Sequence, residues 1–257
     1  MRKSKKISFC VTSCNRLWQL RQTLQSNLNK LRDDFEITLV DYGSSDGLSD
    51  WIWGNFGDFI KFKKLVFFEV KNKVSWNVSK AKNLAHRISN GDYLVNLDAD
   101  NFVGDADINL ILKARSKGVS CHQWSNDLTD GSFGRICLTR DLFFKLGGYD
   151  ESLLPMGGQD VDLLRRIVSI GSPIVRIDAP EITAIKNSME DKVSEINKSN
   201  SDAISLYSSI NKLNLYKSKT RLAIEGPVIT GGFSSYKGLL NGVEVIIDGF
   251  NLIRTTR

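Results

Sequence analysis

The chain has 257 residues, enough for one large domain or two small ones whose core needs no disulfide or structural metal. Hydrophobic residues make up 41% of it and charged residues 25%, which excludes a disordered chain and a collagen-like repeat. Thirty-five lysines and arginines against 29 acids leave a net charge of +6, and there are two histidines. A metal site built from several histidines is therefore excluded.

The expected location is the cytoplasm. No apolar run approaches the roughly 18 residues of a membrane span, and the opening segment is too short and polar for a signal peptide. The cysteines lack the paired spacing of a zinc site. A cytoplasmic chain would keep them reduced, so we expect buried free thiols at Cys10, Cys14, Cys121 and Cys137.

Strands and helices alternate through the first hundred residues. Residues 7–12 predict a buried strand, and leucines spaced three and four apart from Leu17 to Leu31 predict an amphipathic helix. The elements expected next are a strand over 35–41, a short helix over 48–56, a strand over 65–70, a helix over 78–88 and a strand over 93–97. This alternation predicts an α/β fold, a Rossmann-like and mostly parallel central sheet flanked by helices.

The second half continues the pattern and then departs from it. Helices are predicted over 108–118, 140–146 and 161–170, and strands over 119–124, 135–138 and 174–177. Beyond Ile185 the sequence becomes polar, which predicts a helix over 192–213 and short strands between 222 and 253. We therefore expect a domain over 1–190 and a small helical and β appendage over 191–257.

Charge is unevenly distributed along the chain. Residues 61–90 hold eight basic side chains and one acid, whereas residues 91–110 hold five aspartates and no base. A basic segment followed by carboxylates suits a site that binds a polyanion through both cations and a metal. The alternative is that the lysines form a solvated face and the acids cap helices.

Asp98 and Asp100 directly follow the strand over 93–97. Their side chains project from the same side of the chain at the carboxyl end of a strand, where open α/β sheets bind ligands. Two hard oxygen ligands suit Mg²⁺ or Mn²⁺, completed by the phosphates of a nucleoside diphosphate. An isolated D-x-D triplet is a weak signal, and its position after the strand strengthens it.

Further motifs follow one another in a fixed order. They are Thr12-Ser-Cys-Asn-Arg16, Val40-Asp-Tyr-Gly-Ser-Ser-Asp46, Lys82-Asn83, Gly147-Gly-Tyr-Asp-Glu-Ser152 and Gly157-Gly-Gln-Asp-Val-Asp162. With the D-x-D triplet they resemble the inverting GT-A glycosyltransferases of family 2, and the last block is similar to the beta-1,4-galactosyltransferases. The resemblance covers roughly residues 7–185. It implies a GT-A fold and transfer of a hexose from a nucleotide diphosphate sugar, a UDP-sugar being expected.

The resemblance also implies roles for single positions. Asp160 would be the general base that takes a proton from the acceptor hydroxyl. Mn²⁺ or Mg²⁺ would be held by Asp100, Asp98 and Asn187. Contacts to the donor nucleotide would come from Thr12, Arg16, Asp41, Ser44, Lys82, Asn83 and Asp98. Contacts to the acceptor would come from Trp124, Tyr149, Gln159 and Asp162.

Three positions depart from the family pattern. Tyr42 stands where a second acid is usual, and Gln159 replaces the glutamate of the E-D pair, so the nucleotide pocket or the acceptor contacts are expected to differ. No histidine follows the last sheet strand; Asn187 is the nearest replacement and a weaker metal ligand. We therefore expect lower metal affinity than in relatives that carry the histidine.

Other functions compete with this interpretation. Gly43-Ser-Ser-Asp-Gly47 matches a G-x-S-x-G elbow and would make Ser45 a hydrolase nucleophile with His122 as base, although that leaves Asp98 and Asp100 unexplained. A GT-A module that binds sugar or nucleotide without catalysis is a second alternative. His122 could contact substrate or be structural.

The expected partners are a nucleotide sugar donor and a glycan or lipid-linked acceptor in surface polysaccharide synthesis. Basic residues at the N-terminus are compatible with peripheral association with the cytoplasmic face of a membrane. No nucleic-acid partner is expected, because no recognition motif accompanies the basic run.

Overall fold

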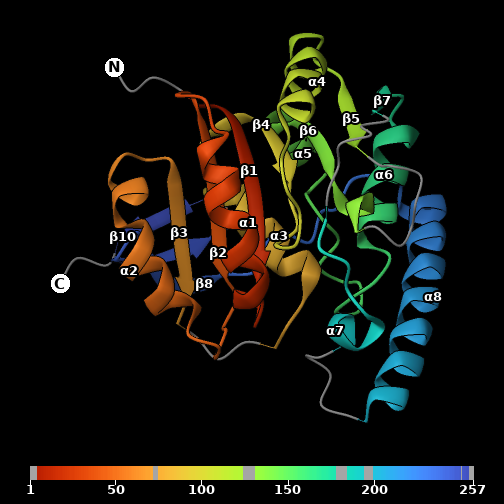
Figure 1. The fold of residues 1–257 in the computed structure, drawn as a ribbon. Helices are drawn as coiled ribbons and strands as arrows, with labels where there is room; N and C mark the ends of the chain where they lie inside the picture. Colours follow the sequence, from red (N-terminus) through yellow and green to blue (C-terminus); the bar gives the residue numbers. More distant parts are fainter. Residues whose placement is uncertain are drawn as a thin grey trace.

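The computed structural model describes residues 5–71, 75–123, 131–177, 184–193, 199–249 and 251–254 (Figure 1). Its first half repeats a strand followed by a helix. The elements in chain order are β1 (Lys5–Ser13), α1 (Leu17–Asn29), β2 (Phe35–Asp41), α2 (Leu48–Lys61), β3 (Leu65–Val70), α3 (Val78–Ile88) and β4 (Gly91–Asn96). Helix α2 runs past its predicted end because Phe56 and Ile60 continue the buried stripe begun by Leu48 and Ile52.

The second half adds shorter strands and the longest described helix. Its elements are α4 (Asp105–Ser116), β5 (Ser120–Gln123), the 3₁₀ turn η1 (Ser132–Gly134), β6 (Ile136–Thr139), α5 (Arg140–Lys145), α6 (Gln159–Ser169), β7 (Ile174–Ile177), α7 (Met189–Val193), α8 (Asn200–Glu225), β8 (Tyr236–Leu240), β9 (Val243–Asp248) and β10 (Asn251–Arg254). Within the described residues, no helix combines the length and apolarity needed to cross a bilayer.

The described strands form one sheet in the order β10-β9-β8-β3-β2-β1-β4-β6-β5-β7. Its centre is parallel as predicted, since β1 pairs in parallel with β2 and β4, and β2 with β3. Towards both edges the pairing is largely antiparallel, with β6 against β4 and β5, and β8 against β3 and β9. The sheet is therefore mixed, and its parallel character is largely confined to the strands joined by the first three helices.

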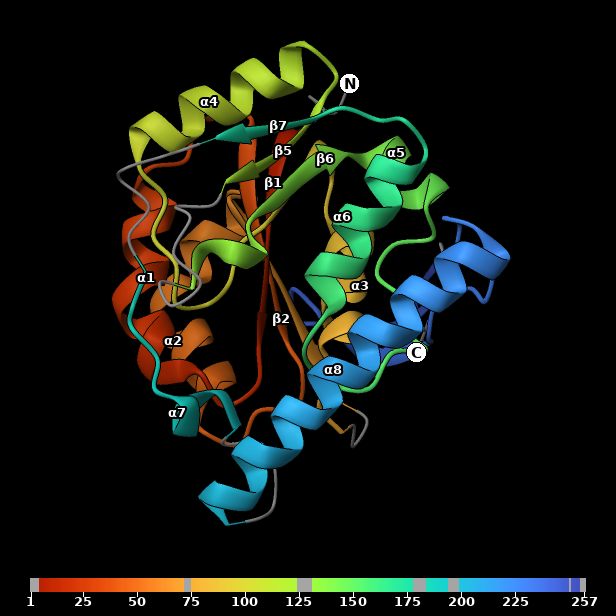
Figure 2. The ribbon, with the colours of Figure 1, turned by 90° about the vertical axis from the view of Figure 1, so that its right-hand side faces the viewer.

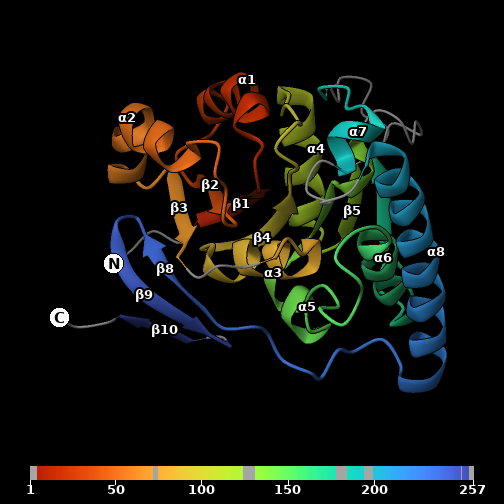
Figure 3. The same cartoon turned by 90° about the horizontal axis from the view of Figure 1, so that it is seen from below.

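Alternation along β1 separates two hydrophobic cores. Ile7, Phe9 and Val11 face a core shared with α1, α2 and α4, whereas Cys10 faces a core shared with α3, α5 and α6. The period of two in a strand sends successive side chains to opposite faces. The result is a sheet covered by helices on both sides, as seen from below in Figure 3.

The C-terminal segment lies at two ends of the fold. Helix α8 packs beside α6 across one end of the sheet (Figure 2). Strands β8, β9 and β10 then continue the sheet beyond β3. The predicted appendage over 191–257 thus shares the central sheet of the preceding residues.

Gly238 tests the junction of β8 with β3. A Cβ at this position would lie 2.3 Å from the Glu69 carbonyl oxygen and 2.5 Å from the Phe68 ring. Gly238→Ala should therefore lower the free energy of unfolding by about 1–3 kcal/mol, the usual cost of overpacking, measured by urea denaturation. The control is Gly231→Ala, where a Cβ meets nothing within 4 Å. Equal stability of the two variants would contradict this pairing.

Candidate active site

A cavity of about 650 Å³ opens at the carboxyl ends of β1 and β4. These neighbouring strands are where the strand order reverses, because β2 and β3 lie on one side of β1 and β4 lies on the other. Such a switch point is where open α/β sheets bind ligands. The residues on its wall come from the end of β1 and the start of α1, the loop after β4, the η1 turn, and helices α3, α6, α7 and α8 with the loops that precede them.

The cavity brings together many of the residues predicted from sequence. The predicted residues on its wall are Thr12, Arg16, Lys82, Asp98, Asp100, Gln159, Asp160 and Asn187. They come from distant segments of the chain, since both Arg16 and Asn187 line the same cavity. The D-x-D triplet and the predicted base therefore share one space.

A buried lysine links two of the carboxylates. The Lys82 Nζ lies 2.8 Å from Asp160 Oδ1 and 3.6 Å from Asp98 Oδ1, and 5.4 Å from the centre of the Tyr149 ring. Burial by itself lowers the pKa of Lys82, but the charges of Asp160 and Asp98 outweigh it and raise the pKa. Burial raises the pKa of Asp160, against the lowering effect of Lys82. Lys82 thus remains a cation between two acids.

Helix α6 positions Asp160 in its first turn. Gly158 caps the helix with a left-handed backbone (φ +83°), and Asp160 is the second helical residue. Free backbone amides and the helix dipole at this end favour a negative charge. The Gln159 side chain is turned toward the loop, where its amide donates to the Leu154 carbonyl oxygen.

Asp100 is a further acid of the site and lies near Asp98. Burial and the nearby charge of Asp98 raise the pKa of Asp100 to about 6. Its carboxylate accepts hydrogen bonds from the side-chain amides of Asn101 and Asn187. The oxygen of the Asn187 amide accepts from Gln19, so Asn187 turns its nitrogen toward Asp100. Asn187 therefore lies beside Asp100, but as oriented its oxygen is not offered to a metal.

The site fits a divalent cation completed by substrate. Among the described residues no group of three or more histidines, cysteines or acids could hold a metal alone. The candidate protein ligands are the carboxylates of Asp98 and Asp100, and oxygens of the substrate would have to complete the site. Space beside Asp98 depends on a glycine, whereas a Cβ at Gly131 would make only an ordinary contact with Asp100. A Cβ at Gly134 would lie 2.6 Å from Asp98 Oδ2, and one at Gly131 would lie 3.6 Å from Asp100 Oδ2. Hard oxygen ligands with room for phosphate suit Mg²⁺ or Mn²⁺.

The comparison with protein families decides the assignment. The model of the family described as glycosyl transferase family 2 matches residues 8–139, just over half of the chain. The chain belongs to glycosyl transferase family 2. An uncharacterized glycosyltransferase of Rickettsia bellii (strain RML369-C) is 29% identical over 112 residues, which are 42% of this chain. The chain spans 15% of the length of that curated relative.

Solved structures of similar fold support the GT-A architecture of this family 2 chain. The mannosyltransferase PcManGT of Pyrobaculum calidifontis, in complex with GDP-Man and Mn²⁺, has a TM-score of 0.56 at 16% identity, covering 86% of this chain and 75% of the other. TarS of S. aureus, residues 1–349 in complex with UDP, has a TM-score of 0.57 at 13% identity, covering 84% and 71%. At these identities the likeness shows the fold alone.

Three predicted contact residues of the family motifs are structural instead. Asp162 is buried with its carboxylate bound by Arg166 and Arg221. The Asn83 side chain is bonded to the backbone N–H and carbonyl of Tyr149. The Tyr149 ring is 1% exposed and lies under Lys82. The structure therefore does not support direct substrate contacts for Asn83, Tyr149 and Asp162.

Asp41 and Ser44, predicted as contacts to the donor nucleotide, lie at and after the end of β2 and off the cavity wall. Asp41 is buried, and its Oδ1 accepts the Ser44 N–H at 2.8 Å, while Ser44 Oγ accepts the Asn15 N–H. Burial raises the pKa of Asp41. Tyr42, in place of the second family acid, contacts Trp76 and donates to or accepts from the Tyr236 hydroxyl. This turn is held by its own hydrogen bonds.

The hydrolase alternative lacks its geometry. Ser45 hydrogen-bonds to Asn15, and α2 begins at Leu48 rather than at the serine. The His122 Nε2 is paired with the Phe133 carbonyl, and burial lowers the pKa of His122. Trp124, the remaining predicted acceptor contact, lies outside the described residues.

Helix α8 supplies wall residues that the family motifs did not indicate. Tyr207, Asn211 and Leu215 line the cavity at intervals of four residues. Asn214 accepts the Leu154 N–H and donates to the carbonyls of the loop before Gly158. The interval of four was visible in the sequence, but nothing indicated that this face, rather than another, meets the cavity.

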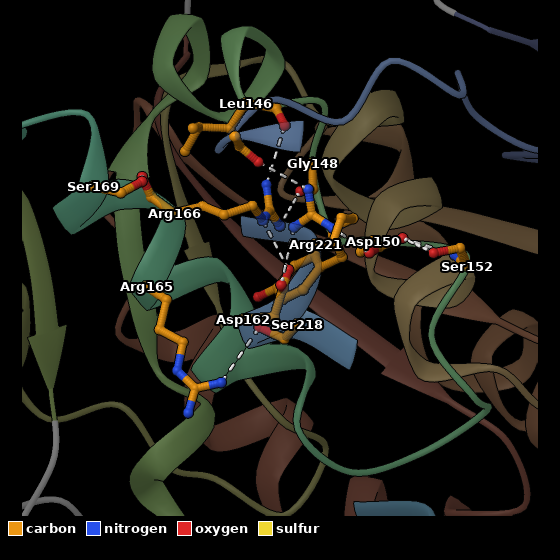
Figure 4. Close-up of polar contacts among 12 residues, drawn as sticks. Leu146, Gly148, Asp150, Ser152, Asp162, Arg165, Arg166, Ser169, Ser218 and Arg221 are labelled. Atoms are coloured by element: carbon orange, nitrogen blue, oxygen red, sulfur yellow. Dashed lines mark hydrogen bonds and ion pairs between the residues drawn. The ribbon is translucent and has the colours of Figure 1, made fainter. Parts of the chain in front are cut away.

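A buried network of two acids and two arginines fixes α8 to α6 (Figure 4). Arg221 of α8 forms ion pairs with Asp150 (3.0 Å) and Asp162 (3.2 Å). Arg166 of α6 pairs with Asp162 at 2.7 Å and donates to the carbonyls of Leu146 and Gly148. The charges balance, which is the condition for burying them. The loop between α5 and α6 is thereby anchored on both sides.

Removal of one arginine should show how far the stability of the fold depends on this balance of charges. Arg221→Met should lower the free energy of unfolding by about 3–5 kcal/mol, because it leaves the Asp150 carboxylate buried without a counter-charge. The double variant Arg221→Met/Asp150→Asn should recover part of that loss, measured by urea denaturation of both single variants and the double. Losses that simply add would show that Arg221 and Asp150 are not coupled.

Proposed function

We propose that this chain carries an inverting glycosyltransferase domain that moves a sugar from a nucleotide diphosphate sugar to a hydroxyl acceptor. The observation that carries the proposal is the convergence of Asp98, Asp100 and Asp160 on one cavity, with Lys82 between two of them. Family membership supports the reaction class. The proposal assigns a diphosphate side to the cavity, near Asp98 and Asp100, and an acceptor side, near Asp160 and α8.

Asp160 would act as the general base. An acceptor hydroxyl beside Asp160 would lose its proton to this carboxylate as its oxygen attacks the anomeric carbon. Attack opposite the departing diphosphate forms the new glycosidic bond as the bond to the diphosphate breaks, and the anomeric centre is inverted. Lys82 lowers the pKa of Asp160 against the effect of burial and so favours the ionised carboxylate, and the free amides at the start of α6 favour it as well.

The donor would be held through its diphosphate. Asp98 and Asp100 would bind Mn²⁺ or Mg²⁺, which supplies positive charge opposite the diphosphate. Lys82 and Arg16, both on the wall, would add to that charge as the leaving group forms. A UDP-sugar is proposed from the sequence motifs; the similar folds were solved with UDP in TarS and with GDP-Man and Mn²⁺ in PcManGT.

The acceptor would be a glycan or a lipid-linked sugar in surface polysaccharide synthesis. Tyr207 and Asn211 of α8 offer an aromatic face and an amide on the acceptor side, the groups that commonly contact sugar rings and their hydroxyls. We also propose a cytoplasmic location for the domain. A domain over 1–190 with an appendage over 191–257 stays a prediction, although α8 contributes to the cavity.

A binding module without catalysis is the competing function. Such a module would need only to recognise the donor. It would not require a carboxylate at the acceptor side. The Asp160 position, paired with Lys82 and facing the same space as Asp98, favours the enzyme.

Asp160→Asn separates the two functions. We expect transfer to fall about 10²–10⁴-fold, because the amide cannot accept the proton, while nucleotide binding persists. Sugar transfer and nucleotide binding are measured on the same preparation. The control is Asp141→Asn, since Asp141 is exposed and also occupies the second position of a helix, α5. Near wild-type transfer by Asp160→Asn would remove Asp160 from the mechanism.

A thermal-shift screen of UDP- and GDP-sugars with and without Mn²⁺ tests the donor side. A ligand of the folded state at about 100 times its Kd adds about 2.7 kcal/mol of stability, which raises the Tm by several degrees. We expect this rise to require Mn²⁺ and to be lost in Asp100→Ala. The control Asp105→Ala, at an exposed carboxylate of α4, should keep it. A Mn²⁺-independent rise would contradict the metal assignment.

A further inference from the structure

Helix α8 presents large apolar side chains on the face opposite the cavity. Leu213, Tyr216 and Ile224 are 57%, 72% and 77% exposed. At 3.6 residues per turn, Leu213, Tyr216 and Ile224 fall in one stripe, with Thr220 between the last two. Figure 2 shows α8 as the outermost element of its side of the molecule, with this length of helix facing the viewer. Apolar residues scattered singly are normal on a protein surface, whereas these three lie along one line of the helix.

Lysines border the stripe on both sides. On the helical wheel Lys212 and Lys219 lie on one side of it and Lys217 on the other, and Lys212 and Lys219 are exposed. From Ala203 to Ile224 the helix contains no acid. Apolar residues flanked by cations, whose long stems can lie along an apolar surface with the charge in the headgroups, are typical of a helix that rests in a membrane interface.

We infer that this outer face of α8 docks onto the surface of an anionic lipid bilayer. Leu213, Tyr216 and Ile224 would enter the interface, and Lys212 and Lys219 would contact acidic headgroups. A second copy of this chain is a poorer partner. In a two-fold contact the same face meets itself, which would set lysines near lysines, because the acids of α8 are confined to its two ends, at Asp202 and Glu225.

The docked orientation would serve the proposed function, on which this part of the inference rests. The opposite face of α8 carries Tyr207, Asn211 and Leu215 on the cavity wall. Docking would therefore hold the acceptor side about one helix diameter, roughly 10 Å, from the bilayer.

Sedimentation with vesicles tests the inference without turnover. The probes are vesicles of phosphatidylcholine alone and of phosphatidylcholine and phosphatidylglycerol in equal parts. We expect the whole chain to bind the anionic vesicles at least about tenfold more tightly, and added salt to weaken the binding. Equal binding to both vesicles, or none to either, would overturn the inference.

Surface variants locate the docking face. The apolar variant Leu213→Ser/Tyr216→Ser/Ile224→Ser and the basic variant Lys212→Ser/Lys219→Ser should each weaken binding at least about tenfold. The matched control replaces exposed apolar residues at the other end of the sheet, Phe62→Ser/Val243→Ser/Leu252→Ser, which are 69%, 52% and 46% exposed. The control should bind as wild type. An equal loss in the control would overturn the inference.

Two further measurements distinguish docking by α8 from binding through the N-terminus and from dimerisation. Replacement of the N-terminal cations (Arg2, Lys3, Lys5 and Lys6) by serine should leave a strong preference for anionic vesicles; loss of binding there, with the α8 variants unaffected, would overturn the inference. The inference would also be overturned if the chain formed a dimer that does not bind vesicles and that the apolar variant dissociates. Every variant is also tested for the nucleotide-dependent rise in Tm, so failure to dock and failure to bind a donor are separate results.

Discussion

The ion pair between Lys82 and Asp160 is the interaction on which the rest of the site depends. Three carboxylates converge on one cavity, and the charge of Asp98 raises the pKa of both Asp100 and Asp160. Lys82 is buried between Asp160 and Asp98, with the Tyr149 ring beneath it. Loss of this cation would leave both acids without their counter-charge. This contact ties α3 to α6, and through Asp98 it ties both helices to the segment that follows β4. It also explains why Tyr149, a motif residue, is buried.

The same constraint extends to the C-terminal helix. Asp160 is placed by the start of α6, which depends on the two left-handed glycines at 157 and 158. Those glycines pack against Asn211 and Asn214 of α8, where a Cβ would come within 3.0–3.1 Å of the side chains. Arg221 then fixes the far end of α8 through Asp150 and Asp162. Helix α8 is therefore a wall of the cavity on one face and an exposed surface on the other.

Features that depend on neighbouring residues could be predicted from the sequence. The alternation of strands and helices predicted the parallel centre of the sheet, and the position of Asp98 and Asp100 after a strand predicted the mouth of the cavity. Contacts between side chains far apart in the chain could not be predicted. Asp162 sits in the same motif as Asp160. It pairs with Arg166, four residues on, and also with Arg221, which lies 59 positions away. The i,i+4 pair was visible in the sequence, but the second partner that completes the burial of Asp162 was not. Asn187 illustrates a finer limit, since its place near Asp100 was predicted but the direction of its amide depends on Gln19.

The sequence by itself determined the fold class, the family motifs and the residue types that could hold a diphosphate, because periodicity and short motifs are properties of neighbouring residues. Only the tertiary structure decided which acids share the cavity, that Lys82 joins two of them, that the edges of the sheet are largely antiparallel, and that α8 closes one side. These depend on burial and on charge balance between segments far apart in the chain. A buried charge is tolerated only with its partner in place, and that partner becomes visible only when the chain is folded.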